Sequence, residues 1–250
     1  MNNSSNDLRL AVLIDADNIP YKVIKEILEE VTKYGTPTFK RIYGDWTNPR
    51  LVGWKNVLLE NAITPIQQYS YTSGKNSSDS ALIIDAMDIL YTGRVDGFCL
   101  ISSDSDFTRL AIRLREAGMK VFGLGEKKTP EAFRSACDKF IYIEILSSKE
   151  KPDTSKSKSK NIQKESISKI DKNLNSLIAN GINDIADENG WAYLGELGNQ
   201  LIKRQPDFDS RNYGFNKLMD LIKSLNNIEI DERETGKRNI KLVYVKNKPK

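Results

Sequence analysis

Apolar runs of strand length alternate with stretches of helix length over the first 146 residues of the chain. The clearest run, LRLAVLI at 8–14, is almost continuously apolar, which is typical of a strand buried on both faces. The pattern predicts strands at 8–14, 36–43, 64–69, 97–102, 119–125 and 139–145. It predicts helices at 20–34, 50–61, 77–91, 105–117 and 130–137. This alternation predicts an α/β fold, a parallel sheet with helices on both faces.

The C-terminal part of the chain follows a different pattern. Residues 166–189 place apolar side chains at helical spacing, and further helical stretches precede two short apolar runs at 227–230 and 239–246. The charged residues 231–238 between those runs, with Gly236 among them, predict a hairpin turn. Three helices followed by a hairpin predict a small α+β winged-helix domain.

A Ser- and Lys-rich stretch separates the two patterns. Residues 147–164 carry six lysines against two acidic residues and almost no apolar side chains, so they cannot bury a core. We therefore predict an N-terminal domain at 1–146, a linker at 147–165 and a C-terminal domain at 166–250. The linker lysines are either a solvated spacer or contacts for a phosphate backbone.

The chain has no histidine, and this absence restricts the possible catalytic and metal-binding chemistry more than any other feature of its composition. Ser-His-Asp catalysis, Cys-His catalysis and histidine-ligated zinc are therefore excluded. Two cysteines, Cys99 and Cys137, are too few for a disulfide framework or a zinc site, which predicts a cytoplasmic protein. No apolar run approaches about 18 residues, and the N-terminus lacks the pattern of a secretory signal, so no membrane association is expected. Among the catalytic groups that remain, carboxylates that hold a hard metal ion fit the composition best.

Carboxylates gather where the predicted strands end. The first strand is followed by DADN (15–18), the strand at 97–102 by SDSD (103–106), and the helix at 77–91 starts with SSDS (77–80). In such sheets, sites form at the carboxyl ends of strands, near the point where strand order reverses. Several carboxylates without a softer donor suit Mg²⁺ or Mn²⁺, because crowded acids repel one another unless a cation intervenes. The sequence thus predicts a divalent-cation site.

Each acid also has a structural interpretation. The role of helix N-cap suits Asp17, Asp79 and Asp106. Asp104 suits a turn after a strand. Inside the apolar helix, Asp85 is expected to support the site or the fold, and Asp88 to face solvent. The joint position of the acids, at two strand ends and a helix start, favours the metal site over these separate roles.

Three ordered motifs resemble the NYN domain of the PIN-like nuclease superfamily. They are LIDADN (13–18), SDSALIIDAMDIL (78–90) and LISSDSDFTRLAIRLREAGMKVFGLG (100–125). The closing AFRSACDKFIYI (132–143) also fits, so the resemblance covers about residues 8–146. It implies a metal-dependent ribonuclease fold, for which the oxygen-only donors predict Mg²⁺ or Mn²⁺.

The resemblance assigns the residues of the site. It implies metal binding by Asp15, Asp79, Asp104 and Asp106. Asn18 is the polar companion of Asp15 and joins these four as a catalytic residue. The family often has Val where this chain has Ser78, but no acid is missing.

Basic and aromatic residues near the same strand ends predict an RNA-binding surface. The residues predicted to bind RNA in this part of the chain are Arg41, Trp46, Arg50 and Lys75. Aromatic platforms among cations suit single-stranded RNA, which is the expected substrate. Packing is the alternative role for Trp46, and it is at least as well supported for Trp54.

The C-terminal part resembles the LOTUS domain, also called the OST-type helix-turn-helix domain. The match, over about 166–246, rests on Trp191, Leu194, Gly195, Leu197, the PDFDSRNYG run at 206–214, and Leu218. It implies RNA binding, for which the phosphate contacts predicted are Lys203, Arg204, Arg211 and Lys217. Docking of a protein partner is the rival role, because the charges of this domain nearly balance.

Two hypotheses from different classes follow. The first is a metal-dependent ribonuclease with an RNA-binding second domain. The alternative is a non-catalytic RNA-binding or scaffolding protein whose LOTUS domain docks a protein. The complete set of four aspartates favours the ribonuclease.

Overall fold

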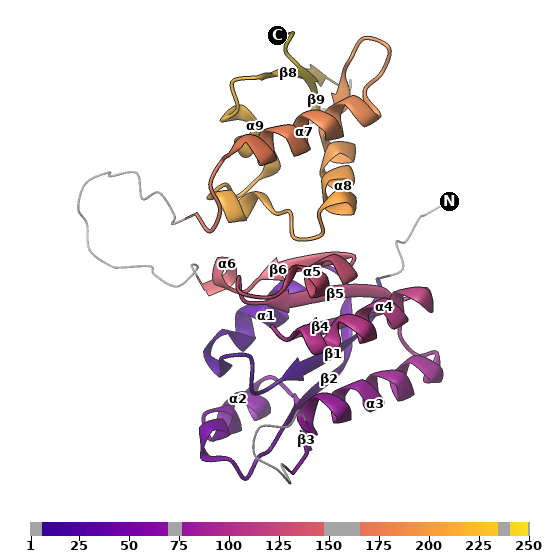
Figure 1. Ribbon diagram of the computed structural model, residues 1–250, viewed down its shortest axis with the longest axis vertical. Helices are drawn as coiled ribbons and strands as arrows, with labels where there is room; N and C mark the ends of the chain where they lie inside the picture. Colours follow the sequence, from indigo (N-terminus) through magenta and orange to yellow (C-terminus); the bar gives the residue numbers. More distant parts are fainter. Residues whose placement is uncertain (1–6, 70–76, 148–165, 235–240, 250) are drawn as a thin grey trace, which may run out of the picture. The chain divides into compact units, whose positions relative to one another are not determined.

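The computed structural model describes residues 7–69, 77–147, 166–234 and 241–249. The chain divides into two compact units, Met1–Lys151 and Pro152–Lys250 (Figure 1). Each unit contains a sheet of its own. Within the residues that the structure describes, no helix is both long and apolar enough to cross a membrane.

The first unit is built on a six-stranded sheet in which all neighbouring strands run parallel. Its strands are β1 (Arg9–Asp15), β2 (Thr36–Gly44), β3 (Thr64–Gln67), β4 (Gly97–Ile101), β5 (Lys120–Gly125) and β6 (Lys139–Tyr142). In space their order is β3-β2-β1-β4-β5-β6, which reverses direction between β1 and β4. The carboxyl ends of these two strands are therefore the place where such a sheet binds ligands.

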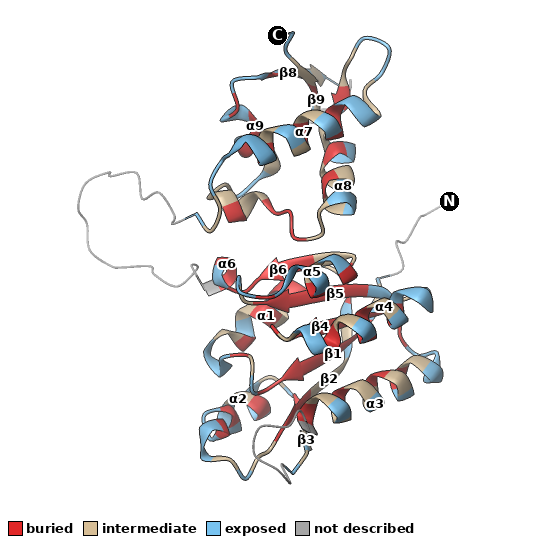
Figure 2. Cartoon of the chain, viewed as in Figure 1, coloured by how far each residue is buried: buried red, intermediate tan, exposed pale blue. Residues whose placement is uncertain are grey.

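Helices cover the sheet (Figure 2), and strands β1, β4, β5 and β6 are almost wholly buried, whereas the edge strand β3 is largely exposed. They are α1 (Ile24–Val31), α2 (Trp54–Glu60), α3 (Ser77–Thr92), α4 (Thr108–Glu116), α5 (Glu131–Ala136) and α6 (Glu144–Ser147). Short 3-10 turns η1 (Tyr21–Val23), η2 (Pro49–Leu51) and η3 (Ser105–Phe107) precede α1, α2 and α4. α3 packs against β1 and β2, α4 against β5, and α1 against α6. The predicted α/β fold is confirmed.

One predicted strand of this unit is too long. The apolar run at 139–145 forms β6 only to Tyr142, and Glu144–Ser147 forms α6. Ile143, Ile145 and Leu146 are all buried. A short, mostly buried apolar run carries too little alternation to separate strand from helix, which is why the sequence pattern missed the change.

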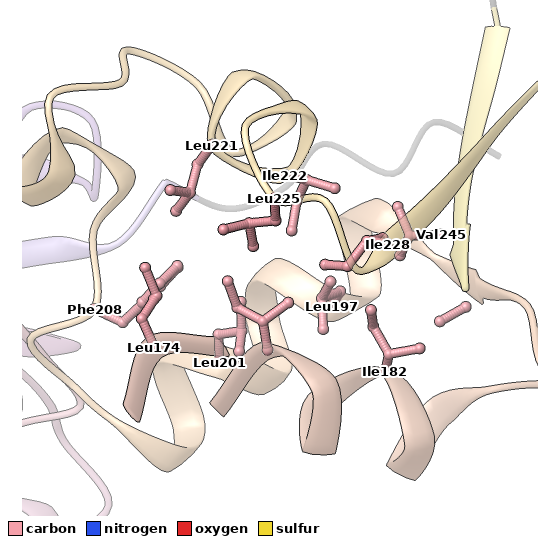
Figure 3. Close-up of a cluster of buried hydrophobic side chains, with 12 residues drawn as sticks. Leu174, Ile182, Leu197, Leu201, Phe208, Leu221, Ile222, Leu225, Ile228 and Val245 are labelled. Carbon is pink, nitrogen blue, oxygen red and sulfur yellow. The ribbon is translucent and has the colours of Figure 1, made fainter. Parts of the chain in front are cut away.

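The second unit joins three helices to a small antiparallel sheet. Its elements are α7 (Lys172–Ile185), β7 (Ala192–Tyr193), α8 (Leu194–Arg204), η4 (Ser210–Tyr213), α9 (Leu218–Lys223), β8 (Ile228–Glu234) and β9 (Lys241–Asn247). The strand order is β7-β9-β8. The core joins Ile182 of α7, Leu197 and Leu201 of α8, and Val245 of β9 (Figure 3). This unit confirms the predicted small α+β domain.

Two boundaries in this unit differ from the prediction. The helix expected at 166–189 begins at Lys172, because the Asp171 side chain caps it by accepting a hydrogen bond from the backbone N of Leu174 at 2.8 Å. The first four residues of the turn expected at 231–238 instead extend β8 in register with β9, and residues 235–238 lie outside the described residues. Charged residues on a strand with one solvated face carry no turn signal of their own.

The predicted linker offers a direct test of the domain boundaries. Most of it, residues 148–165, lies outside the described residues. We expect brief trypsin treatment to cut first after the lysines of 147–164 and to leave two resistant fragments, because folded backbone resists cleavage. Mass spectrometry of the fragment ends measures this. Lysines inside the two units serve as the internal control, and one resistant core spanning 147–164 would contradict the division.

Candidate functional site

The predicted acids lie at the reversal point of the large sheet. Asp15 is the last residue of β1, and Asp104 follows the end of β4 at Ile101. Asp79 lies in the first turn of α3, which packs against β1. The structure thus brings three sequence segments to one edge of the sheet.

Three of these carboxylates converge. Asp79, Asp104 and Asp106 each offer one oxygen, and the three oxygens lie within 4.8 Å of one another. A cation that binds each oxygen at about 2.0–2.6 Å requires separations of this size. Asp79 and Asp104 are half-buried and Asp106 is exposed, so the group is open to a ligand on one side. The oxygen-only donor set suits a hard divalent cation.

The loop after β4 holds Asp104 in a fixed position. Asp104 is the N-cap of η3, and its Oδ1 accepts a hydrogen bond from the backbone N of Asp106 at 2.9 Å. Its own backbone N donates to the Ser102 hydroxyl at 3.1 Å. The cap in this loop is therefore Asp104 and not Asp106, to which the sequence interpretation gave that role.

Asp15 is buried beneath this loop. Its carboxylate accepts hydrogen bonds from the Asn18 side chain at 2.6 Å, the Ser102 hydroxyl at 2.7 Å and the backbone N of Asp17 at 3.1 Å. Burial raises the pKa of Asp15, while these donors oppose the rise. Asp15 is not among the three acids whose oxygens converge. It connects to them through Ser102, whose hydroxyl donates to Asp15 and accepts from Asp104.

The acids share one electrostatic field. Burial, followed by the charges of Asp15, Asp104, Asp106 and Asp17, raises the pKa of Asp79 to about 6. Like charges disfavour a further negative charge, and a bound cation relieves that repulsion. The residues present therefore fit a divalent cation.

Two contributors were absent from the predicted site. Ser102 bridges Asp15 and Asp104, and Asp17 accepts a weak hydrogen bond from Ser78 at 3.4 Å. The serine in the position often held by Val thus contacts an acid of the first strand end. Ser102 stands directly after a buried strand and before Ser103 and Asp104, which is the signal that could have indicated it.

Arg41 lies one strand away and is held by Asp85. Asp85 accepts hydrogen bonds from both the Arg41 guanidinium and the Tyr43 hydroxyl. Burial and the Asp85 charge raise the pKa of Tyr43, so this hydroxyl stays protonated. The cluster ties α3 to β2, which gives Asp85 a structural role. Asp88 is exposed, as predicted.

The other basic and aromatic residues chosen in this unit differ in exposure. The Trp46 indole donates to the Ile66 carbonyl at 3.0 Å and is partly buried. Arg50 is exposed, whereas Trp54 is buried and confirms its packing interpretation. Lys75 lies outside the described residues.

Two of the four basic residues chosen in the second unit form ion pairs. The Arg211 guanidinium donates to Asp209 at 2.7 and 2.9 Å, and Arg204 pairs with Asp184. Lys203 and Lys217 are exposed. Asp209 also caps η4, and Gly214 ends it with a φ of 85°, a left-handed conformation that favours glycine. Asp209, Arg211 and Gly214 of the PDFDSRNYG run thus have local structural roles.

Comparison with family models identifies both units. The NYN domain model matches residues 9–144, which is more than half of the chain. The chain therefore belongs to the NYN domain family, whose fold is that of the PIN-like nucleases. The OST-HTH/LOTUS domain model matches residues 165–240, and domains of this type bind RNA. No curated protein matches the chain.

Solved structures cover parts of the chain. A protein of unknown function from Vibrio parahaemolyticus is 20% identical with a TM-score of 0.48, over 57% of this chain and 96% of its own. An uncharacterized protein from Nitrosomonas europaea is 32% identical with a TM-score of 0.32, over 40% of this chain and 94% of its own. Residues 175–257 of a Chromobacterium violaceum protein are 27% identical with a TM-score of 0.27, over 31% and 82%.

Proposed function

We propose that this chain is a Mg²⁺- or Mn²⁺-dependent ribonuclease that cleaves single-stranded RNA, with a LOTUS domain that adds RNA affinity. The observation that carries the proposal is the convergence of carboxylate oxygens from Asp79, Asp104 and Asp106 within 4.8 Å. The NYN family, which is a nuclease family, supports the reaction class. We also propose a cytoplasmic location, because the two cysteines, Cys99 and Cys137, are both free.

The residues of the site would divide the work. Asp79, Asp104 and Asp106 would hold the cation, and Asp15 would orient the Asp104 loop through Ser102. A bound hard cation supplies an activated water and stabilises charge on the phosphate and the leaving oxygen. Because the chain has no histidine, a carboxylate or water must carry the proton. Asn18 would keep Asp15 in place through its 2.6 Å hydrogen bond.

A specific observation favours the second candidate function, a non-catalytic protein with a docking LOTUS domain. Arg204 and Arg211 are paired with carboxylates of their own unit, which lowers the charge available to phosphates. The assay that separates the candidates uses the full chain and end-labelled single-stranded RNA with Mg²⁺, Mn²⁺ or EDTA. The same strand as duplex RNA and as DNA serves as the comparison. We expect metal-dependent cleavage that is fastest on single-stranded RNA, and RNA that stays intact in both metals would favour the scaffold.

Deleting residues 166–250 should separate affinity from chemistry. The metal centre lies wholly in the first unit, so weak metal-dependent cleavage should persist. RNA affinity should fall by roughly a hundredfold, because two linked modules bind one strand more tightly than either alone. Anisotropy titrations in EDTA at several salt concentrations measure this. Unchanged affinity at every salt concentration would identify the second unit as a protein-docking module.

A further inference from the structure

The small sheet of the second unit has two faces of different character. Residues alternate across a strand, so neighbours point to opposite faces. Ala192 and Val245, which pair in register, are fully buried in the core. Tyr193 and Tyr244, the next pair in register, therefore belong to the outer face. α7 and α8 pack against the inner side of β9, and the Asn247 side chain on that side donates to the Ala179 carbonyl of α7 at 2.9 Å.

Aromatic rings and cations on the outer face contact one another. The Tyr193 and Tyr244 ring centroids are 5.8 Å apart. The Arg233 guanidinium carbon lies 4.0 Å from the Tyr244 centroid and 5.6 Å from that of Trp191. The Lys246 amine lies 5.8 Å from the Trp191 centroid. We call this group, Trp191, Tyr193, Arg233, Tyr244 and Lys246, the aromatic platform.

Local contacts hold the platform in shape while leaving it accessible. Asp231 accepts a hydrogen bond from Arg233 Nε at 2.8 Å, and Asp187 accepts one from the backbone N of Trp191 at 2.9 Å. Tyr193 is 41% exposed, and so is the Arg233 side chain. Rings fixed by their neighbours lose little conformational freedom when a flat ligand stacks on them.

The charges of the platform indicate which part of a nucleic acid it suits. Arg233 is paired with Asp231, and Lys246 lies opposite Glu229 in the strand register. The two cations are therefore balanced by two acids, so phosphate attraction is weak here. The exposed ring of Tyr193, beside the half-buried rings of Trp191 and Tyr244 and the Arg233 guanidinium, suits unpaired bases, which stack without regard to sequence.

We propose that the outer face of β7, β9 and β8 binds unpaired RNA bases by stacking on the aromatic platform. This inference rests on the proposed function in one respect, namely that the chain binds single-stranded RNA. It assigns that binding to a face different from the basic residues chosen on α8 and η4, of which Arg204 and Arg211 are already paired.

The test uses the full chain in EDTA, so that binding is measured without cleavage. Fluorescence anisotropy with a labelled single-stranded RNA compares the wild type with Y193L and Y244L, which keep an apolar side chain but remove the ring. We expect each to weaken binding about fivefold or more, since stacking on one ring contributes at least that factor. Y244F keeps the ring and should bind like the wild type. Y91L, at an exposed tyrosine of α3, is the matched control and should also bind like the wild type.

Two further readouts distinguish stacking from charge and from misfolding. An abasic strand of equal length should bind the wild type more weakly than the normal strand, and the leucine variants should lose this preference. Circular dichroism melts confirm that the variants are folded, and Y244F restores the ring if Y244L unfolds. Wild-type affinity in both leucine variants, or equal binding of the abasic strand, overturns the proposal and leaves the face as a protein-docking surface. Failure of metal-dependent cleavage with platform binding intact would count against the nuclease alone.

Discussion

Replacing Asp104 with asparagine is expected to abolish most metal-dependent RNA cleavage. The change keeps the side-chain volume but removes one of the three converging charges. Removing a residue that merely supports a metal ligand typically costs 10- to 100-fold in activity, so loss of a ligand should cost more than about a hundredfold. Initial rates of cleavage in Mn²⁺ and Mg²⁺ measure the effect.

The same change should leave the fold and RNA binding intact. Asparagine is as good an N-cap as aspartate, so the bond that Oδ1 accepts from the backbone N of Asp106 is retained. RNA affinity in EDTA should be equal or slightly higher, because a charge that repels phosphate has gone. Asp88→Asn, at an exposed position of α3, is the matched control and should cleave like the wild type. Wild-type rates for Asp104→Asn in Mn²⁺ would rule out the metal role assigned here to Asp104.

The position of the acids could be predicted because it follows from local pattern. Apolar runs identify β1 and β4, and a parallel sheet places the residues after both runs at one edge. The structure adds that β1 and β4 are neighbours, which brings Asp15 and Asp104 to adjacent strand ends. The common edge could therefore be predicted from local pattern, whereas the order of the strands could not.

Pairings between distant residues could not be predicted in this way. Arg41 is 44 residues from Asp85 in sequence, and nothing in either segment indicates that the two meet. Arg41, near a strand end, was therefore predicted to bind RNA, whereas its guanidinium is paired with Asp85. The aromatic platform could not be predicted for the same reason. Tyr244 lies beside Tyr193 only because β9 pairs with β7, and these strands are distant in the sequence.

The burial of Asp79 and the charges around it destabilise the metal-free protein, and stability measurements should detect this cost. Asp79→Asn is expected to stabilise the metal-free protein at pH 7.5 while removing metal-dependent cleavage. The pKa of Asp79 is raised from 3.8 to about 6. Between these values the folded state binds more protons than the unfolded state, so stability falls as pH rises through this window. Above it the full penalty is present, and the neutral amide removes it.

The size of the effect follows from the same pKa. The rise of the Asp79 pKa from 3.8 to about 6 corresponds to roughly 3 kcal/mol. Because Asp79 is only half-buried, we expect the free energy of unfolding to rise by about 1–2 kcal/mol, or a few degrees in melting temperature. Melts in EDTA at pH 7.5 and pH 4 measure it. The gain should fall to a small remainder at pH 4, where Asp79 is neutral in the folded protein and nearly half neutral in the unfolded chain. Asp88→Asn should show no gain at either pH.

Added metal should reverse the order of stability. A cation that binds only the folded protein stabilises it in proportion to the logarithm of its concentration over Kd. Mn²⁺ at pH 7.5 should therefore raise the melting temperature of the wild type more than that of Asp79→Asn. The variant has lost the charge of one of the three converging carboxylates. If Mn²⁺ raises both melting temperatures equally, Asp79 is not a ligand. If the variant is no more stable than the wild type in EDTA, burial and the neighbouring acids do not raise the pKa of Asp79. Both results as expected would mean that the charge of Asp79, which burial and the neighbouring acids disfavour, is offset by a cation that binds there.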